Sequence, residues 1–335
     1  MPERLNQLRA WVSHTLALPT PEILAVTNDA SFRRYFRVLL AEGSLIVMDA
    51  PPERENCLPF IHVAQKLADS GLNVPKVIEA DLAQGFLLLT DLGSDLYLPA
   101  LQNGQAETLY QDALRALVVM QACTSTEGVP LYDHALLHTE MNLFRDWLLG
   151  THLNLALSAA ESTALAASFE LLSQNALSQP QVFVHRDYHS RNLMVTPHNN
   201  PGILDFQDAV CGAVTYDLVS LLRDCYIKWT PEQVAQWVRS YYLLALQSGI
   251  LKGVEEQQFT RWFDLMGIQR HLKASGIFAR LYRRDGKSGY LQDIPRTLEY
   301  IVQVSSAYPE LRDLYDLVKH KVLPAYQQSL PSFAP

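Results

Sequence analysis

The sequence predicts an α+β fold with two lobes, a small β-rich N-terminal lobe over residues 1–92 and a larger, mainly α-helical C-terminal lobe over residues 93–335. The chain has 335 residues, which exceeds the size at which a single hydrophobic core usually stops growing. Strand-like segments are concentrated before residue 92, and helical periodicity dominates after it. Hydrophobic residues make up 48% and charged residues 19%, so the composition is that of an ordinary globular protein.

The N-terminal lobe is expected to be a small sheet with one main helix. Apolar residues at helical spacing predict a short amphipathic helix at the start of the chain: Leu5, Leu8, Trp11, Val12 and Leu16. The segments RRYFRVLL and SLIVMD, on either side of a turn at 41–43, predict an antiparallel hairpin. A helix over 56–70 ends before Gly71, and two strands follow in VPKVIEAD and GFLLLTD.

The C-terminal lobe shows helical periodicity with one β-like interruption. The expected helices cover 104–122, 138–150, 158–178, 214–227, 231–248, 254–275 and 309–328. The interruption is QVFVHRDYHSRNLMVTPHNNPGILDFQD, in which the apolar runs VFV, LMV and GIL predict short strands separated by polar loops.

Charge and cysteine content exclude several classes of protein. The net charge of −8 disfavours a nucleic-acid or anionic-membrane binder, because phosphate groups demand clustered positive charge. The four cysteines are widely separated, so neither a zinc site nor a disulfide framework is indicated. No basic leader with an apolar run and no membrane-spanning stretch is found. We therefore expect a cytoplasmic protein and a monomer.

Two polar loops carry the strongest functional signal. His185-Arg186-Asp187-x-x-x-x-Asn192 follows one short apolar run, and the loop that begins at Asp205 follows another. Phosphoryl transfer from ATP needs an oriented acceptor hydroxyl and a metal ion that neutralises phosphate charge. Asp187 would be the catalytic residue that accepts or orients the proton of the hydroxyl, and Asn192 and Asp205 would be the Mg²⁺ ligands. The alternative is that Asp, Asn and His occur here simply as common turn-forming residues.

Longer strings resemble a known family. VFVHRDYHSRNLMV and GILDFQDAVCGAVTYDLVSLLRD resemble the catalytic and metal-binding segments of the aminoglycoside phosphotransferase and choline kinase-like family, over most of the chain. NDASFRRYFRV, VMDAPPERENCLPF, LLLTDLG and GIQRHLKASGIFARLYRRDGK are similar to the anomeric N-acetylmuramate/N-acetylglucosamine kinases of bacterial cell-wall recycling.

This resemblance implies both a fold and a reaction. The fold would be bilobal and protein-kinase-like. The reaction would be Mg²⁺- and ATP-dependent phosphorylation of the anomeric hydroxyl of an amino sugar, giving an α-1-phosphate for peptidoglycan recycling. Two alternatives remain open at this stage: a kinase of another small alcohol (an aminoglycoside, choline or homoserine), and a kinase-like binding protein without turnover.

The nucleotide site departs from the protein-kinase pattern. No Gly-rich loop is possible before residue 92, and SLIVMD carries Met48 and Asp49 where a phosphate-pairing lysine is expected. The segment 29–37 is the natural substitute, and its candidate nucleotide-binding residues are Ser31, Arg33 and Arg34. Strand alternation places the two neighbouring arginines on opposite faces, so both cannot contact one nucleotide. The alternative is a solvated basic strand edge.

The segment 86–91 is expected to connect the lobes and to contact adenine. Its backbone groups would pair with the base, its leucines would supply apolar walls, and Leu89 and Asp91 are the candidate nucleotide-binding residues. The alternative is that these leucines only form core.

A basic segment is the candidate determinant of substrate choice. Residues 261–290 contain seven basic and two acidic residues, a net charge of +5 in a chain of −8. Such a segment suits an anionic ligand, such as a sugar carboxylate or the nucleotide phosphates, and would repel polycationic aminoglycosides. Spacings of three and four residues would place one set of side chains on a single helical face if the helix persists through Gly276: Arg270, Lys273, Ile277, Arg280 and Arg284. The other candidate substrate-binding residues are His189, Arg191 and Asp224. A solvated helix face is the alternative.

Overall fold

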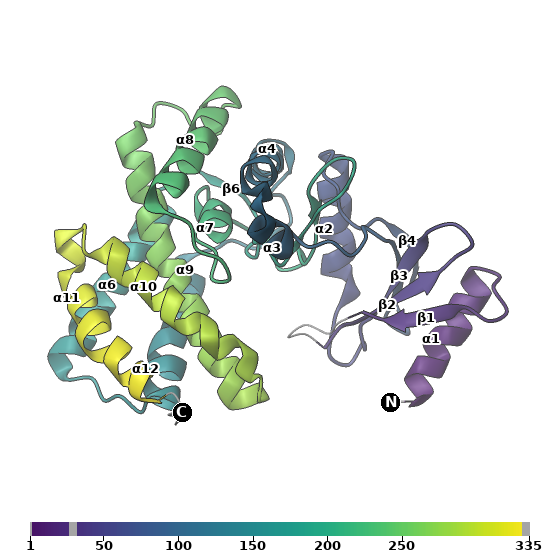
Figure 1. Ribbon diagram of the computed structural model, residues 1–335, viewed down its shortest axis with the longest axis horizontal. Helices are drawn as coiled ribbons and strands as arrows, with labels where there is room; N and C mark the ends of the chain where they lie inside the picture. Colours follow the sequence, from purple (N-terminus) through teal and green to yellow (C-terminus); the bar gives the residue numbers. More distant parts are fainter. Residues whose placement is uncertain (1, 27–31, 330–335) are drawn as a thin grey trace. The chain divides into compact units, whose positions relative to one another are not determined.

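The computed structural model describes residues 2–26 and 32–329, and the chain forms two compact units (Figure 1). The first unit contains the described residues up to Asp112 together with Arg191–Asp208, and the second contains Ala113–Ser190 and the residues from Ala209 onwards. These units do not coincide with lobes divided after residue 92, and that division stays a prediction. No helix in the described part of the chain is both long and apolar enough to cross a membrane.

The first unit is built around a five-stranded antiparallel sheet. Its order is β1-β2-β3-β5-β4, with β1 Glu22–Ala25, β2 Arg34–Leu39, β3 Ser44–Asp49, β4 Val77–Asp81 and β5 Phe86–Thr90. The helices α1, Pro2–Thr15, and α2, Cys57–Asp69, complete this part of the unit. The predicted hairpin, the following helix and the two further strands are therefore confirmed.

Alternation along the strands gives the sheet an apolar face that α1 covers. Leu8 and Val12 of α1 form one buried cluster with Phe36, Val47 and Leu88 of the sheet. Because side chains alternate across a strand, Arg34 shares the face of Phe36, and the neighbouring Tyr35 faces the other way. Arg34 lies directly across from Asp49 on β3.

Residues 191–208 join the first unit through backbone pairing. The short strands β7, Leu193–Met194, and β8, Gly202–Ile203, pair with each other. Gly202 also bridges to Asn73, and the Val195 N–H donates to the carbonyl of Asp95 at 2.6 Å. The latter contact lies just before α3, Tyr97–Ala100, which a π-helical turn at 101–105 connects to α4, Ala106–Cys123.

The second unit is mainly helical. Its helices are α5 His134–Leu143, α6 Ala159–Leu177, α7 Tyr216–Leu222, α8 Pro231–Gln247, α9 Glu256–Asp285, α10 Ile294–Ser305, α11 Arg312–Leu317 and α12 Leu323–Ser329. The strands β6, Gln181–Val184, and β9, Val210–Ala213, pair antiparallel. Shorter segments lie at 144–152 and 318–322, which are π-helical, and at 288–293 and 309–311, which are 3₁₀.

Most expected helices are present, and several elements were not predicted, among them α10 and β9. α6 starts with a reciprocal capping box between Ser158 and Glu161, which fixes its first turn. α10 was missed, although Pro295 in its first turn is a typical helix-start signal. β9 was also missed, because VCGA has no alternation and depends on its pairing with β6.

The helix α9 continues through Gly276, which is the condition for the basic residues on either side of it to share one helical face. A Cβ atom at this position would lie 2.3 Å from the carbonyl carbon of Leu143, at the junction of α5 and the π-helical turn. Helix α9 can approach the backbone so closely only because residue 276 lacks a side chain.

We expect Gly276→Ala to destabilise the protein by about 1–3 kcal/mol, because the added methyl group must displace backbone rather than a flexible side chain. Thermal unfolding would measure the loss. Gly289→Ala is the matched control, since nothing lies within 4 Å of its added Cβ. Equal unfolding temperatures for the two variants would contradict the close approach.

Candidate active site

The loop after β6 is held by a buried carboxylate on α7. Asp217 is fully buried and accepts hydrogen bonds from the backbone N–H groups of His185, at 2.6 Å, and Arg186, at 3.0 Å. Arg186 has φ +77°, a left-handed conformation that persists only where the surroundings impose it. Burial raises the pKa of Asp217 to about 7, against the opposing effect of the two N–H donors. These two hydrogen bonds therefore fix the backbone next to Asp187.

Asp187 is surrounded by positive charge. Its burial raises the pKa of the carboxyl group, but nearby basic side chains outweigh this effect and lower the pKa to about 2: Lys273, His189, Arg270 and Arg186. The side chain is partly exposed. Asp187 is therefore ionised at neutral pH, as a group that accepts the proton of a hydroxyl must be.

A second buried carboxylate, Glu140 on α5, fixes two of these cations. Glu140 forms ion pairs with Arg186 and, at 3.0 Å, with the Nζ of Lys273, and it accepts a hydrogen bond from the Tyr132 hydroxyl. Burial opposes its ionisation, but Lys273 and Arg186 hold the pKa of Glu140 below its usual value. Glu140 was not predicted as a site residue, and the available signal was a lone acid in the apolar helix HALLHTEMNL.

The two predicted substrate residues on α9 differ in how their charges are satisfied. Lys273 is 7% exposed, and its Nζ also donates to the Tyr216 hydroxyl at 2.9 Å. Arg270 is 5% exposed, and its Nε has no hydrogen-bond partner among the residues that the structure describes. The carboxylates of Asp187 and Asp224 both act on the Arg270 guanidinium. Arg270 is therefore the less satisfied of the two cations beside Asp187.

The other predicted substrate residues lie in two different parts of the structure. Asp224 is 1% exposed and accepts hydrogen bonds from the N–H and hydroxyl of Ser190 and, at 2.9 Å, from the Tyr226 N–H. The His189 ring packs edge-on against Tyr226, with ring centroids 5.3 Å apart. Arg191 belongs to the first unit, unlike the other candidates. These contacts favour a positioning role for Asp224, and its substrate role stays a prediction.

The predicted metal ligands both lie in the first unit and are close together. The Asn192 Nδ2 lies 3.5 Å from the Asp205 Oδ2, and the Gln207 amide donates to the other oxygen of Asp205 at 2.8 Å. Asp205 has φ +63°, and the ring of the following Phe206 packs on Phe60 of α2 with centroids 4.9 Å apart. An exposed carboxylate close to an asparagine side chain, whose amide carries an oxygen, suits the hard oxygen ligands that Mg²⁺ prefers.

The predicted nucleotide-binding residues at the first hairpin have ion-pair partners. Ser31 lies outside the described residues. Arg33 pairs with Glu55 at 3.0 Å. Arg34 lies on the α1-covered face, where it and Arg4 neutralise the fully buried Asp49. The two arginines thus have different carboxylate partners, Glu55 and Asp49, and their nucleotide roles stay predictions.

Leu89 and Asp91 are the candidates from the last strand. Leu89 is 1% exposed and lies opposite Ile46 in the sheet. The Asp91 carboxylate accepts hydrogen bonds from Arg37, from the Ser44 hydroxyl at 2.7 Å and from the Gly93 N–H at 2.9 Å. Burial opposes its ionisation, yet these donors lower the pKa of Asp91. The Asp91 carboxylate is therefore engaged within the protein.

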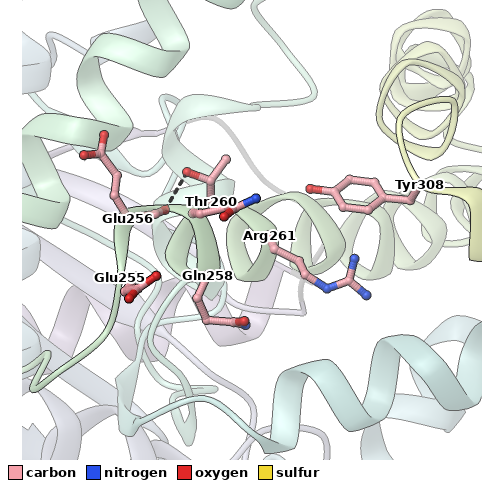
Figure 2. Close-up of a pocket in the computed structure, with 7 residues that line it drawn as sticks. Glu255, Glu256, Gln258, Thr260, Arg261 and Tyr308 are labelled. Atoms are coloured by element: carbon pink, nitrogen blue, oxygen red, sulfur yellow. Dashed lines mark hydrogen bonds between the residues drawn. The ribbon is translucent and has the colours of Figure 1, made fainter.

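A pocket of about 680 Å³ lies at the N-terminal end of α9 (Figure 2). Its lining residues are polar and include Glu255, Glu256, Arg261 and Tyr308. None of the predicted catalytic, metal, nucleotide or substrate residues lines it. We therefore assign it no part in the phosphoryl-transfer site.

Comparison with known proteins identifies the family. Residues 22–249 match the model of the phosphotransferase enzyme family. A protein from Pseudomonas aeruginosa named N-acetylmuramate/N-acetylglucosamine kinase is 43% identical, over 94% of this chain and 96% of its own. One from Pseudomonas putida with the same name is 44% identical, over 95% and 97%.

Solved structures agree at the level of fold. The choline kinase LicA from Streptococcus pneumoniae has a TM-score of 0.63 at 13% identity, covering 90% of this chain and 99% of its own. The ADP-bound aminoglycoside phosphotransferase APH(2'')-Ib has a TM-score of 0.58, again at 13% identity, with coverages of 90% and 98%. The predicted protein-kinase-like α+β fold is thus confirmed, and the chain belongs to the phosphotransferase enzyme family.

Proposed function

We propose that this chain transfers the γ-phosphoryl group of ATP to the anomeric hydroxyl of N-acetylmuramate and N-acetylglucosamine, giving the α-1-phosphate and ADP. The observation that carries the proposal is Asp187, a partly exposed carboxylate on a fixed loop with a pKa of about 2. The names of the relatives at 43% and 44% identity supply the class of acceptor. We also propose that the reaction takes place in the cytoplasm and that the protein is a monomer.

Asp187 would accept a hydrogen bond from the anomeric hydroxyl and aim its oxygen at the γ-phosphorus. The new oxygen–phosphorus bond forms as the bond to the leaving ADP oxygen breaks. Because the pKa of Asp187 is about 2, the proton moves to its carboxylate late, when the attacking oxygen has become acidic. Asn192 and Asp205 would hold Mg²⁺, which when bound neutralises charge on the phosphate oxygens.

Turnover with defined acceptors tests this proposal. ATP consumption would be measured with Mg²⁺ and each of N-acetylmuramate, N-acetylglucosamine, kanamycin, choline and homoserine, with phosphorus NMR of the product. We expect consumption with the two amino sugars and an α-1-phosphate signal. Phosphorylation of another hydroxyl would refute the anomeric assignment, and turnover only with choline, homoserine or kanamycin would refute the acceptor class.

Arg270 is the residue through which we propose that the enzyme recognises the carboxylate of N-acetylmuramate. Its guanidinium is nearly buried, and its Nε lacks a partner in the described part of the chain. A charge-assisted hydrogen bond to a carboxylate would satisfy it. Lys273 is satisfied by Glu140 and Tyr216, so we assign it the role of lowering the pKa of Asp187.

We expect Arg270→Gln to lower kcat/KM for N-acetylmuramate about 10- to 100-fold more than for N-acetylglucosamine, because only the former carries a carboxylate. The ratio of the two kcat/KM values removes any common effect of the substitution on Asp187. Arg261→Gln is the matched control, since Arg261 lies on the same helix and pairs with Glu310 instead. An unchanged ratio in Arg270→Gln would exclude this role.

A further inference from the structure

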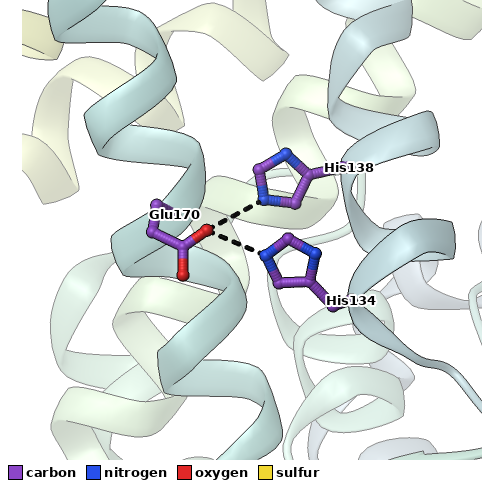
Figure 3. A group of neighbouring side chains, drawn as sticks. All are labelled: His134, His138 and Glu170. Carbon is purple, nitrogen blue, oxygen red and sulfur yellow. Dashed lines mark hydrogen bonds and ion pairs between the residues drawn. The ribbon is translucent and has the colours of Figure 1, made fainter.

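Two histidines and a glutamate form a cluster on neighbouring helices of the second unit. His134 and His138 are four residues apart on α5, so their imidazoles lie on one face of the helix. Glu170 comes from α6 and points at both rings (Figure 3). Its Oε2 lies 2.8 Å from the Nε2 of His134 and 3.5 Å from the Nε2 of His138.

The cluster has the spacing of a transition-metal site. One donor atom from each residue lies within 4.8 Å of the other two. A tetrahedral zinc ion has bonds of about 2.0–2.2 Å to imidazole nitrogen and carboxylate oxygen, which places its ligand atoms roughly 3.4 Å apart. The separations of 2.8 and 3.5 Å between the Glu170 oxygen and the two imidazole nitrogens bracket that value, and the donor atoms of the two imidazoles lie within 4.8 Å of each other. Small side-chain movements would therefore admit the ion.

The surroundings hold the three donors in place. The His134 and His138 rings are stacked with centroids 4.2 Å apart, and His138 also packs edge-on against Phe169. The second oxygen of Glu170 accepts a hydrogen bond from the Gln174 amide at 2.9 Å. Such outer contacts orient metal ligands. The Nε2 of His138 is shielded from solvent and has no hydrogen-bond partner among the described residues.

We propose that His134, His138 and Glu170 bind one Zn²⁺ ion, with water in the fourth position. Two imidazoles and a carboxylate suit zinc rather than Mg²⁺, which prefers a set of oxygen ligands. The ion would link the first turns of α5 to the middle of α6. Because α5 also carries Glu140, two residues after His138, the site would stabilise the helix that fixes Arg186 and Lys273.

Zinc binding to the metal-stripped full chain tests the proposal, without ATP in the solution. Titration with Zn²⁺ against a chromophoric chelator should give one ion per chain and should be unaffected by millimolar Mg²⁺. We expect His138→Ala and Glu170→Gln each to weaken this binding by about 10-fold or more. His320→Ala is the matched control, because His320 is an exposed histidine in the π-helical segment after α11 and has a nearby carboxylate, Asp316, four residues earlier.

Thermal unfolding and a Co²⁺ spectrum give readouts besides affinity. Zn²⁺ should raise the unfolding temperature of the wild type and of His320→Ala but not of the two ligand variants, since it binds only the folded site. Co²⁺ bound to the wild-type chain should show the intense visible bands of a four-coordinate site, which requires no variant to fold. Equal zinc affinity in wild type, His138→Ala and Glu170→Gln, or a six-coordinate Co²⁺ spectrum, would overturn the proposal.

Discussion

Asp187→Asn should lower kcat for sugar phosphorylation by about 10²–10⁴-fold and leave the KM for ATP nearly unchanged. The amide cannot take the proton of the attacking hydroxyl, although it keeps the size and the loop position of the carboxylate. Steady-state kinetics with N-acetylmuramate would measure the first effect. Calorimetric titration of the variant with ATP would show whether the affinity for ATP is unchanged.

The control for this variant is Asp146→Asn, which removes an exposed carboxylate of the same unit that pairs only locally with Arg145. It should retain wild-type turnover. Full turnover by Asp187→Asn would contradict the catalytic assignment. Loss of both ATP binding and cooperative unfolding would point to a folding defect instead.

The pH dependence of the wild type gives a second check on Asp187. The folded-state pKa of about 2 lies below the ordinary value of 3.8. The ionised carboxylate therefore stabilises the fold above the unfolded value, and this contribution is lost as the pH falls from about 4 towards 2. We accordingly expect no decline in kcat/KM from this group above about pH 4.

Lys273→Met should raise the pKa of Asp187 by removing the cation with the largest effect on it.

Asp205→Asn should weaken Mg²⁺-dependent binding of ATP by about 10- to 100-fold, the loss expected for one charged interaction. Asparagine is chosen because it tolerates the left-handed φ of +63° at this position, so the loop conformation should survive. Binding of ATP would be measured by calorimetry with Mg²⁺ and with EDTA.

The matched control is Asp69→Asn, an exposed carboxylate at the end of α2 in the same unit. It should bind Mg·ATP like the wild type. The affinity for ATP should be higher with Mg²⁺ than with EDTA. If Asp205→Asn kept the full wild-type difference between these two affinities, Asp205 would not be a metal ligand. An equal loss of affinity in EDTA would indicate disruption of the nucleotide site rather than of the metal.

The sequence predicted the elements whose signal is local. The β2–β3 hairpin follows from period-2 alternation around a glycine turn, and α9 follows from its long helical period. The helix α10 is rich in isoleucine, valine and threonine, which weakens its intrinsic helical signal, and its apolar face is buried. The strand β9 is recognisable only through its pairing with β6, which lies 26 residues earlier in the chain.

The candidate residues of the site could be chosen from the sequence, but the side chains that contact them could not. The spacing of Asp187, Asn192 and Asp205 was visible in the sequence, and the two predicted metal ligands, Asn192 and Asp205, lie close together. The satisfaction of Asp91 by Arg37 was not predictable, because 54 residues separate them. The same holds for Glu140 and Lys273, which come from α5 and α9. Tertiary packing alone decides which charges are left available to a ligand.

Asp217 accepts hydrogen bonds from two backbone N–H groups, and this has a consequence for how the sequence can vary. A contact with the main chain places no demand on the side chains of the residues that donate it. The carboxylate at 217 is then under strong constraint, whereas this anchor does not depend on which side chain stands at 185. Position 186 is constrained separately, by its left-handed φ and by the ion pair with Glu140. Laboratory evolution towards new acceptors should therefore keep residues 186 and 217 fixed.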